Sequence, residues 1–505
     1  MPAAFAAFVA VVEAQSDAER SSTVIDRAAV ALGGREALAR LDRWVVSGRG
    51  RENLGAEWQG RDTREPTWRE HQETVAVAGD AVAWERRTPR NDLSLRWRRF
   101  IYGADASGFV DWNAGRGRLS PPGTPLADRQ AIARRIPHVL LRELAQSAGA
   151  VRWIGERQLE GRVHDVIDAR LPDATTVRVF IARSSSTLGR LEYDVFMPGL
   201  GDAVISWTWS GWTPDRALGL KPARHIVSVG DTVYQQVDLS RYEAGAADAP
   251  SFVQLPGDLK AAQMSMAAPP AAVPPATGEV APGIHVRTVQ GFNVAAIVGR
   301  DSVIAIETPE AARGLEAIPA SNTARAGRVA PEQLAWLDEA FPGKPIRFLI
   351  ISHHHGDHIG GAPLLASRGA TVITSSADEA PARHALGASR RLAPWPQAPG
   401  TGTPRVDAVR NRRVINDGVR DIEIISTGDN PHTSDNLFVW LPAERILFQG
   451  DLFYFDEGGA FPPSGRETMN RFFAQFLEAR GIRPRAIYGV HNLGAAGPEA
   501  LARIK

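Results

Sequence analysis

Four histidines and an aspartate lie within six residues, from His353 to His358. This HHHGDH segment follows an apolar run (346–351) and precedes a glycine pair. Imidazole and carboxylate groups together suit zinc or another first-row divalent ion. Side chains at positions 353, 355, 357 and 358 cannot all face one way on a strand or a helix. They can converge on a loop, where Gly356 lets the backbone turn, so the sequence predicts a metal site after a buried strand.

The composition limits the classes of protein and of site. The chain has 505 residues, too many for one ordinary core, so two or more domains are expected. Apolar residues make up 44% and charged residues 23%, as in globular proteins, and the net charge of +1 predicts no nucleic-acid partner. The absence of cysteine excludes disulfides, thiolate metal ligands and a cysteine nucleophile.

The first residues bear on localisation. Ala3 to Val12 is small and apolar, and Val12-Glu13-Ala14 could be a cleavage site, which is typical of a secretory signal. No basic residue precedes the apolar run, so this signal is incomplete. We expect a periplasmic or secreted protein, with a cytoplasmic one as the alternative. No other stretch approaches the length of a transmembrane span.

A change of composition separates two halves of the chain. Proline and alanine dominate Met264 to Pro282, without periodicity and almost without charge, which indicates an extended linker. The predicted organisation is a signal or N-terminal segment (1–22), a β-rich domain (23–258), a linker (259–282) and a catalytic domain (283–505).

The half before the linker predicts a curved antiparallel sheet with a few helices. Period-two alternation marks strands at 191–197 and 205–210. A helix is expected from Thr23, as its N-cap, to Leu41, and one or two more between Arg129 and Ala148. This part weakly resembles the half-barrel of lipoprotein-carrier proteins. Its tryptophans are expected in the core rather than along a ligand groove.

The half after the linker alternates strands and helices. The pattern predicts two sheets covered by helices, an αββα sandwich in the α/β class. Strands are expected at 284–289, 292–298, 303–308, 346–351, 422–426, 437–441, 446–448 and 486–490, and helices at 331–341 and 469–480.

The spacing His353-x-His355-x-Asp357-His358 resembles the signature of the metallo-β-lactamase superfamily. Further motifs of that superfamily can be matched over residues 285–493: a histidine in GDNPHT (His432), an aspartate after a strand (Asp451) and a late histidine (His491). One position departs from the pattern. The early strand ends in Glu307 where the superfamily has an aspartate, so this residue is expected to orient a ligand through its longer side chain.

The resemblance implies two divalent metal ions and favours zinc as their identity. One would be held by His353, His355 and His432, the other by Asp357, His358 and His491, with Asp451 as the bridge. His354, between the ligands, is expected to point away from them. His384 is expected on an exposed loop.

The implied activity is that of a hydrolase. A metal-bound hydroxide would attack an ester, lactone, lactam or similar acyl bond of a small molecule, and Asp357 would guide its proton. The chain resembles the exported metallo-hydrolases of the superfamily in its Asn-Pro-His stretch and in Glu307.

Other functions stay open. The alternatives are a phosphodiesterase of the same fold, or an exported protein that binds an apolar ligand and whose metal site is structural or vestigial. Seven ligands favour an enzyme, because a structural zinc needs four. Trp395, Phe453, Tyr454 and Phe461 could either line the cleft or serve in packing.

Overall fold

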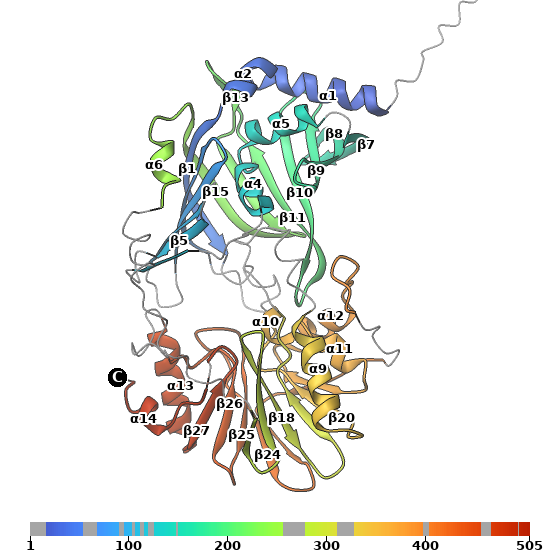
Figure 1. Cartoon of the computed structure of the whole chain (residues 1–505), viewed down its shortest axis with the longest axis vertical. Helices are drawn as coiled ribbons and strands as arrows, with labels where there is room; N and C mark the ends of the chain where they lie inside the picture. Colours follow the sequence, from blue (N-terminus) through green and yellow to red (C-terminus); the bar gives the residue numbers. More distant parts are fainter. Residues whose placement is uncertain are drawn as a thin grey trace, which may run out of the picture.

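The computed structural model describes residues 17–53, 68–89, 95–103, 107–111, 116–119, 126–147, 150–255, 278–310, 328–396, 403–455, 466–492 and 494–504. Residues 1–16 of the predicted signal or N-terminal segment (1–22), most of the predicted linker, and Phe461 lie outside these ranges. Figure 1 shows a β-rich N-terminal part above a C-terminal part that contains two sheets. No helix among the described residues is long and apolar enough to cross a membrane.

The N-terminal part contains one antiparallel sheet of thirteen strands, in the order β6-β5-β4-β3-β2-β1-β15-β14-β11-β10-β9-β8-β7, and a small ribbon of β12 and β13. Figure 1 shows the large sheet curving around α4 and α5. The strands are β1 (Arg43–Asn53), β2 (Trp68–Ala78), β3 (Ala81–Pro89), β4 (Leu95–Tyr102), β5 (Ser107–Asp111), β6 (Arg116–Leu119), β7 (Val151–Leu159), β8 (Arg162–Arg170), β9 (Thr176–Ala182), β10 (Leu188–Met197), β11 (Gly201–Ser210), β12 (Thr213–Asp215), β13 (Gly219–Lys221), β14 (Arg224–Val229) and β15 (Thr232–Ala244).

The predicted first helix is wrong in its bounds. Two helices, α1 (Asp17–Ala31) and α2 (Arg35–Arg40), replace it, because Gly33 and Gly34 adopt φ values of 93° and 95° that end a helix. Thr23 is not an N-cap: it lies inside α1, and its hydroxyl donates to the carbonyl of Glu19 at 2.9 Å. The other helices here are α4 (Leu126–Ala133), α5 (Pro137–Gln146) and α6 (Ala249–Phe252).

The concave side of the sheet holds the main N-terminal core. Trp44, Trp84, Trp207 and Trp209 are all at most 5% exposed and belong to one apolar cluster with residues of α1, α4 and α5. These four tryptophans are therefore core residues, as expected from the sequence.

The C-terminal part is an αββα sandwich, as predicted. In the first sheet, seven strands lie side by side in the order of the sequence. They are β16 (Gly278–Ala281), β17 (Ile284–Val289), β18 (Phe292–Val298), β19 (Val303–Ile306), β20 (Ile346–Ile350), β21 (Thr371–Ser375) and β22 (Arg405–Val409). The second sheet contains β23 (Arg412–Asn416), β24 (Asp421–Ser426), β25 (Leu437–Leu441), β26 (Ile446–Gln449) and β27 (Ala486–Gly489). Apolar side chains of both sheets, such as Ile304, Ile350 and Val439, form the core between them.

Helices cover the outer face of each sheet (Figure 1). One side carries α9 (Val329–Ala340), α10 (Gly356–Ile359), α11 (Ala362–Ala366) and α12 (Glu379–Gly387), and the other carries α13 (Glu467–Arg480) and α14 (Pro498–Leu501). This arrangement leaves the strand ends that follow β20, β26 and β27 free to carry polar loops.

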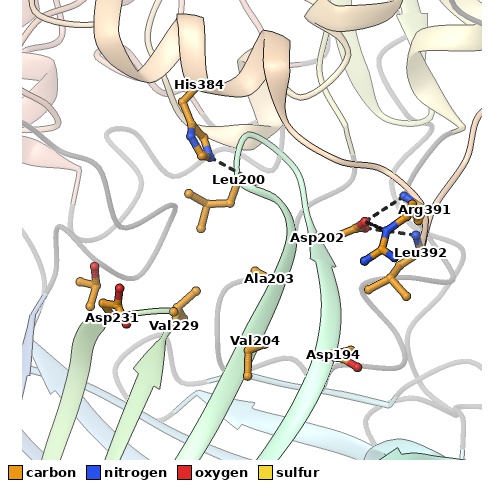
Figure 2. Close-up of a pocket in the computed structure, with 12 residues that line it drawn as sticks. Asp194, Leu200, Asp202, Ala203, Val204, Val229, Asp231, His384, Arg391 and Leu392 are labelled. Atoms are coloured by element: carbon orange, nitrogen blue, oxygen red, sulfur yellow. Dashed lines mark hydrogen bonds and ion pairs between the residues drawn. The ribbon is translucent and has the colours of Figure 1, made fainter.

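The tip of the β10–β11 hairpin contacts the C-terminal part. Asp202 accepts hydrogen bonds from the backbone N–H groups of Arg391 and Leu392, at 2.9 and 3.1 Å, and from the hydroxyl of Ser389. Beside this contact lies a cavity of about 520 Å³ lined from both parts, which Figure 2 shows.

His384 takes part in the same contact. It lies on α12 rather than on an exposed loop, and its half-buried Nε2 donates to the carbonyl of Leu200 at 3.2 Å (Figure 2). The prediction for this residue is therefore wrong, because the partner comes from a hairpin 184 residues away in the chain.

Candidate metal centre

The HHHGDH segment begins where β20 ends. Its backbone leaves the strand in an extended conformation, and His355 precedes the short helix α10, which carries Asp357 and His358. Gly360 follows α10 in a crowded position, where a Cβ would lie 2.8 Å from the side chains of Glu310 and Pro198. The tight packing fixes the turn that presents the histidines.

His432 is held in a turn built by its neighbours. Asn430 accepts hydrogen bonds from the backbone N–H groups of His432 and Thr433, both at 2.9 Å. The Asp435 carboxylate closes the base of the turn by accepting from the Ser426 hydroxyl and the Gly428 N–H. The Asn-Pro-His stretch is thus a rigid side-chain-capped turn.

Asp451 and His491 follow neighbouring parallel strands, β26 and β27. After β26 the Gln449 amide accepts hydrogen bonds from the N–H groups of Leu452 and Phe453, at 3.0 and 3.1 Å. Because the carboxyl ends of parallel strands lie at the same edge of a sheet, Asp451 and His491 meet there.

The structure brings all seven predicted ligands together in two adjoining groups. Within each group the candidate ligand atoms lie within 4.8 Å of one another. The groups are His353, His355 and His432, and then Asp357, His358, Asp451 and His491.

Asp451 lies between the two groups. Its Oδ1 is 3.2 Å from Nε2 of His358 and 3.3 Å from Nε2 of His491, and its Oδ2 is 3.4 Å from Nε2 of His432. Asp357 approaches His491 from the other side, with Oδ2 at 3.2 Å from Nε2. Both oxygens of one carboxylate therefore face ligands of different groups, as a bridging ligand requires.

The donor atoms fit divalent cations. Nε2 of His353 and Nε2 of His432 lie 3.1 Å apart, close to the separation of about 3.3 Å expected for two nitrogens bound to one zinc ion in tetrahedral geometry. Asp357 Oδ1 is buried without a hydrogen-bond partner among the described residues. Buried polar atoms in native proteins are normally paired, so this atom fits the role of a cation ligand.

The electrostatics of the two groups differ. Burial lowers the pKa values of His353 and His355 well below the usual range and that of His432 to about 4. These three imidazoles are neutral near pH 7, which is the protonation state that binds metals. Burial also opposes the protonation of His358 and His491, but Asp451 and its neighbouring carboxylates outweigh it and raise both pKa values.

A sequence model of the metallo-beta-lactamase superfamily matches residues 326–491. This segment belongs to the metallo-beta-lactamase superfamily. The matched segment contains all seven candidate ligands, whereas the strands from β16 to β19 and the whole N-terminal part lie outside it. Members of the superfamily are mostly hydrolases, and some are oxidoreductases.

Solved structures show a distant similarity to part of this chain. A metallo-beta-lactamase from Pontibacter korlensis is 18% identical, with a TM-score of 0.33, and the alignment covers 45% of this chain and 94% of that one. The DIM-1 metallo-beta-lactamase is 17% identical over 46% of this chain and 95% of that one, with a TM-score of 0.33. The rubredoxin oxygen:oxidoreductase of Desulfovibrio gigas is 15% identical, with a TM-score of 0.32, and the alignment covers 45% of this chain and 58% of that one. A search among curated proteins gives no significant match.

In the metallo-beta-lactamase-fold domain, Glu307 directly follows β19 and lies beside the candidate ligands. Its Oε1 accepts the backbone N–H of Ser352 at 2.9 Å, and its Oε2 lies 3.1 Å from Nδ1 of His358. Since Nε2 of His358 faces Asp451, Glu307 orients this imidazole from behind.

His354 points away from the other histidines. Its Nδ1 lies 2.7 Å from Oδ1 of Asp378, and both side chains are buried. The pair fixes the HHHGDH turn against the start of α12. No pattern in the sequence indicates this acceptor, because Asp378 is separated from the motif by β21.

Two further residues lie near the site: Tyr454, which the sequence indicates as a candidate for the cleft, and Arg466, which it does not indicate. Burial raises the pKa of the Tyr454 hydroxyl well above its usual range, and the nearby Asp451 carboxylate adds to this effect. Arg466 lies over the Tyr454 ring, with the guanidinium carbon 3.9 Å from the centroid. A phenol that stays protonated and a cation therefore lie beside the metal ligands.

The other described aromatic residues that were candidates for the cleft are packed. Phe453 is completely buried and stacks on Phe473 at 4.9 Å between centroids. Trp395 is half-buried, and its Nε1 donates to Glu310 at 3.3 Å. Of the described candidates, Tyr454 is the one beside a metal ligand.

Proposed function

We propose that this protein is a dinuclear-metal-dependent hydrolase that cleaves an ester, lactone, lactam or similar acyl bond of a small molecule. The observation that carries the proposal is the position of Asp451 between two groups of ligands, with one oxygen toward His358 and His491 and the other toward His432. A site with seven ligands exceeds the four that a closed structural zinc uses.

The residues divide the work of holding the cations. His353, His355 and His432 would bind one ion, and Asp357, His358 and His491 the other, with Asp451 shared between them. Two divalent ions in such a site lower the pKa of a water molecule and polarise the oxygen of the scissile bond. Zinc suits the imidazole-rich donor set.

Two side chains are suited to handle protons and charge. The buried Oδ1 of Asp357 has no hydrogen-bond partner among the described residues, so it is available to accept a proton from the attacking water. The hydroxyl of Tyr454, held protonated by burial, is suited to donate to an oxyanion that develops beside Asp451. We therefore assign Asp357 the role of general base and Tyr454 that of a hydrogen-bond donor.

Metal analysis and a substrate screen test this proposal together. Purified protein should contain about two transition-metal ions per chain and hydrolyse at least one member of a panel of chromogenic esters, lactones and cephalosporins. Asp451→Ala should lose at least one ion and nearly all activity. Asp338→Ala, an exposed change on α9, is the matched control and should keep both.

The other results of the same screen are equally decisive. Turnover of phosphodiesters alone would show that the protein cleaves a phosphoryl bond and not an acyl bond. Two iron ions with reduction of an electron acceptor, and no hydrolysis, would make the protein an oxidoreductase. One metal ion per active chain would refute the dinuclear site.

A further inference from the structure

The β10–β11 hairpin of the N-terminal part reaches the helix that carries two candidate metal ligands. Figure 1 shows the lower end of β10 beside α10, the helix of Asp357 and His358. Pro198 is buried at the tip of the hairpin and packs on Gly360, the residue that follows α10. A Cβ at Gly360 would lie 2.8 Å from the Cβ of Pro198. The N-terminal part therefore contacts the metal-binding motif directly.

Arg390 makes a second connection between the same hairpin and α10. Its guanidinium carbon lies 4.1 Å from the ring centroid of Phe196, near the end of β10, and 3.7 Å from that of Trp395. Its Nη1 donates to the carbonyl of Gly360 at 3.4 Å, and its Nε donates to the carbonyl of Ala393 at 3.1 Å. One side chain thus contacts both the hairpin and the end of α10.

The charge of Arg390 strengthens this connection. Burial lowers the pKa of Arg390 to about 10, against the opposing charges of Glu310 and Asp202, so the guanidinium stays protonated near pH 7. The last carbonyls of a helix have no partner within the helix, and a charged donor satisfies such a carbonyl well. A cation between two aromatic rings is also held by their negative faces. Loss of the guanidinium would remove both kinds of contact together.

The segment after β19 holds α10 through its backbone carbonyls. The N–H of Thr308 donates to the carbonyl of His358 at 3.1 Å, and the N–H of Glu310 donates to that of Gly356 at 3.4 Å. Nε1 of Trp395 donates to the Glu310 carboxylate at 3.3 Å. Because the guanidinium described above lies on this tryptophan, the hairpin is connected with α10 through this segment as well.

We propose that the tip of the β10–β11 hairpin is a positioning element of the metal centre and that Arg390 is the positioning residue which connects it with α10. Asp357 and His358, the ligands on α10, both belong to the group that includes Asp451 and His491. The hairpin contact therefore sets the affinity for the ion that this group holds. By thermodynamic reciprocity, binding of that ion tightens the hairpin contact. The inference rests on the metal binding of the proposed function and not on the bond that is cleaved.

Zinc affinities of the full chain, measured by competition with a chelator, test the first half of the proposal. Arg390→Met should weaken the binding of one of two zinc ions about tenfold, as is typical when a group that orients ligands is lost, and leave the other nearly unchanged. Arg390→Lys keeps the charge and a donor, so it should restore most of the affinity. Arg391→Met is the matched control, because its exposed guanidinium faces Asp202 of the same hairpin, and it should bind zinc normally.

Two results of the titration would overturn the proposal. Unchanged zinc affinities in Arg390→Met would show that its contact with Gly360 does not affect the metal centre. Equal weakening of both ions, together with a lowered melting temperature of the metal-free protein, would show that Arg390 supports the fold as a whole and does not position α10.

Amide hydrogen exchange tests the second half and needs no variant. The N–H of Asp202 donates to the carbonyl of Ser389 at 2.7 Å, so its exchange reports on the hairpin contact. Zinc should slow this exchange relative to the metal-free protein, and Arg390→Met should remove most of the difference. Amides of β8 and β9, which belong to the same sheet, are the control and should exchange equally in both states.

The exchange measurement also separates this proposal from the proposed activity. Equal exchange of the Asp202 amide with and without zinc, in a protein that hydrolyses a substrate, would overturn the positioning role alone. Zinc-dependent exchange in a protein that hydrolyses none of the panel would support the positioning role and refute the hydrolase alone.

Discussion

Oε2 of Glu307 lies 3.1 Å from Nδ1 of His358, and Nε2 of the same imidazole lies 3.2 Å from Asp451. One histidine ring thus connects the end of β19 with the proposed bridging carboxylate. Glu307 holds this position with φ of 63°, a conformation that costs a non-glycine residue about 1–3 kcal/mol. Strain of this kind at the back of a ligand indicates that its orientation matters for the site.

Glu307→Gln should weaken metal binding without abolishing it. The amide oxygen can still accept one hydrogen bond, but the charge that favours a basic His358 is lost. We expect an affinity about 10–100-fold lower, measured by competition with a chelator. Asp357→Asn should have a much larger effect, because it removes the charge of a ligand.

The exposed change Glu339→Gln on α9 is the control and should leave metal affinity as it is. If Glu307→Gln matched Asp357→Asn in its loss of metal, Glu307 would itself be a ligand. If it had no effect at all, its contact with His358 would be irrelevant to the site.

Asp378→Ala should destabilise the fold and leave the metal content unchanged. The substitution removes the buried acceptor that lies 2.7 Å from Nδ1 of His354. The loss of such a partner costs about 1–3 kcal/mol, measurable by chemical denaturation of the purified protein. Loss of metal in proportion to the loss of stability would contradict the separation of His354 from the ligands.

Gly201→Ala should loosen the contact between the hairpin tip and the C-terminal part. Gly201 has φ of 84°, and a Cβ there would lie 2.6 Å from the Ser389 carbonyl oxygen. Gly230→Ala, at φ of 54° with open space around it, carries the backbone strain alone. The first variant should therefore melt at a lower temperature than the second, and equal melting temperatures would show that the contact contributes nothing.

His138 should make the N-terminal part less stable in acid. Burial lowers its pKa to about 4, and the neutral ring bridges the Tyr242 hydroxyl at 2.7 Å and the Leu218 carbonyl at 3.3 Å. The unfolded chain binds a proton below about pH 6.5 and the folded one only near pH 4, so stability present above pH 6.5 is lost between these values. The loss amounts to about 3 kcal/mol.

The comparison with His138→Gln isolates this contribution. The free energies of unfolding of the two proteins, followed by tryptophan fluorescence, should converge as the pH falls from 7 to 4. A constant difference over that range would show that His138 keeps an ordinary pKa when folded.

Local sequence signals were sufficient to predict that the seven candidate ligands lie together and to predict the layers of the C-terminal part. These signals are short patterns: HHHGDH follows an apolar strand, and single acidic or histidine residues follow later strands. The backbone places the ends of these strands at one edge of the sandwich. The break of the first helix could also have been read from Gly33 and Gly34. The predicted helix rested on Thr23 as an N-cap, whereas two consecutive glycines are a stronger signal for the end of a helix.

The remaining features depend on contacts between distant parts of the chain. The acceptor of His354 and the hairpin partner of His384 cannot be inferred from neighbouring residues. Each is decided by which strand or helix packs opposite, and no periodic pattern encodes that choice. Tyr454 was considered, but its proximity to Asp451 became evident in the folded chain.

The hairpin contact has a consequence for biosynthesis. Asp202 leaves the ribosome 187 residues before Ser389, the residue whose hydroxyl it accepts, and domains generally fold in the order of their synthesis. The hairpin tip is thus available before the 388–392 loop exists, and that loop forms against a finished surface. Expression of the C-terminal part alone would leave the N–H groups of Arg391 and Leu392 without this acceptor, so the two halves should be produced as one polypeptide.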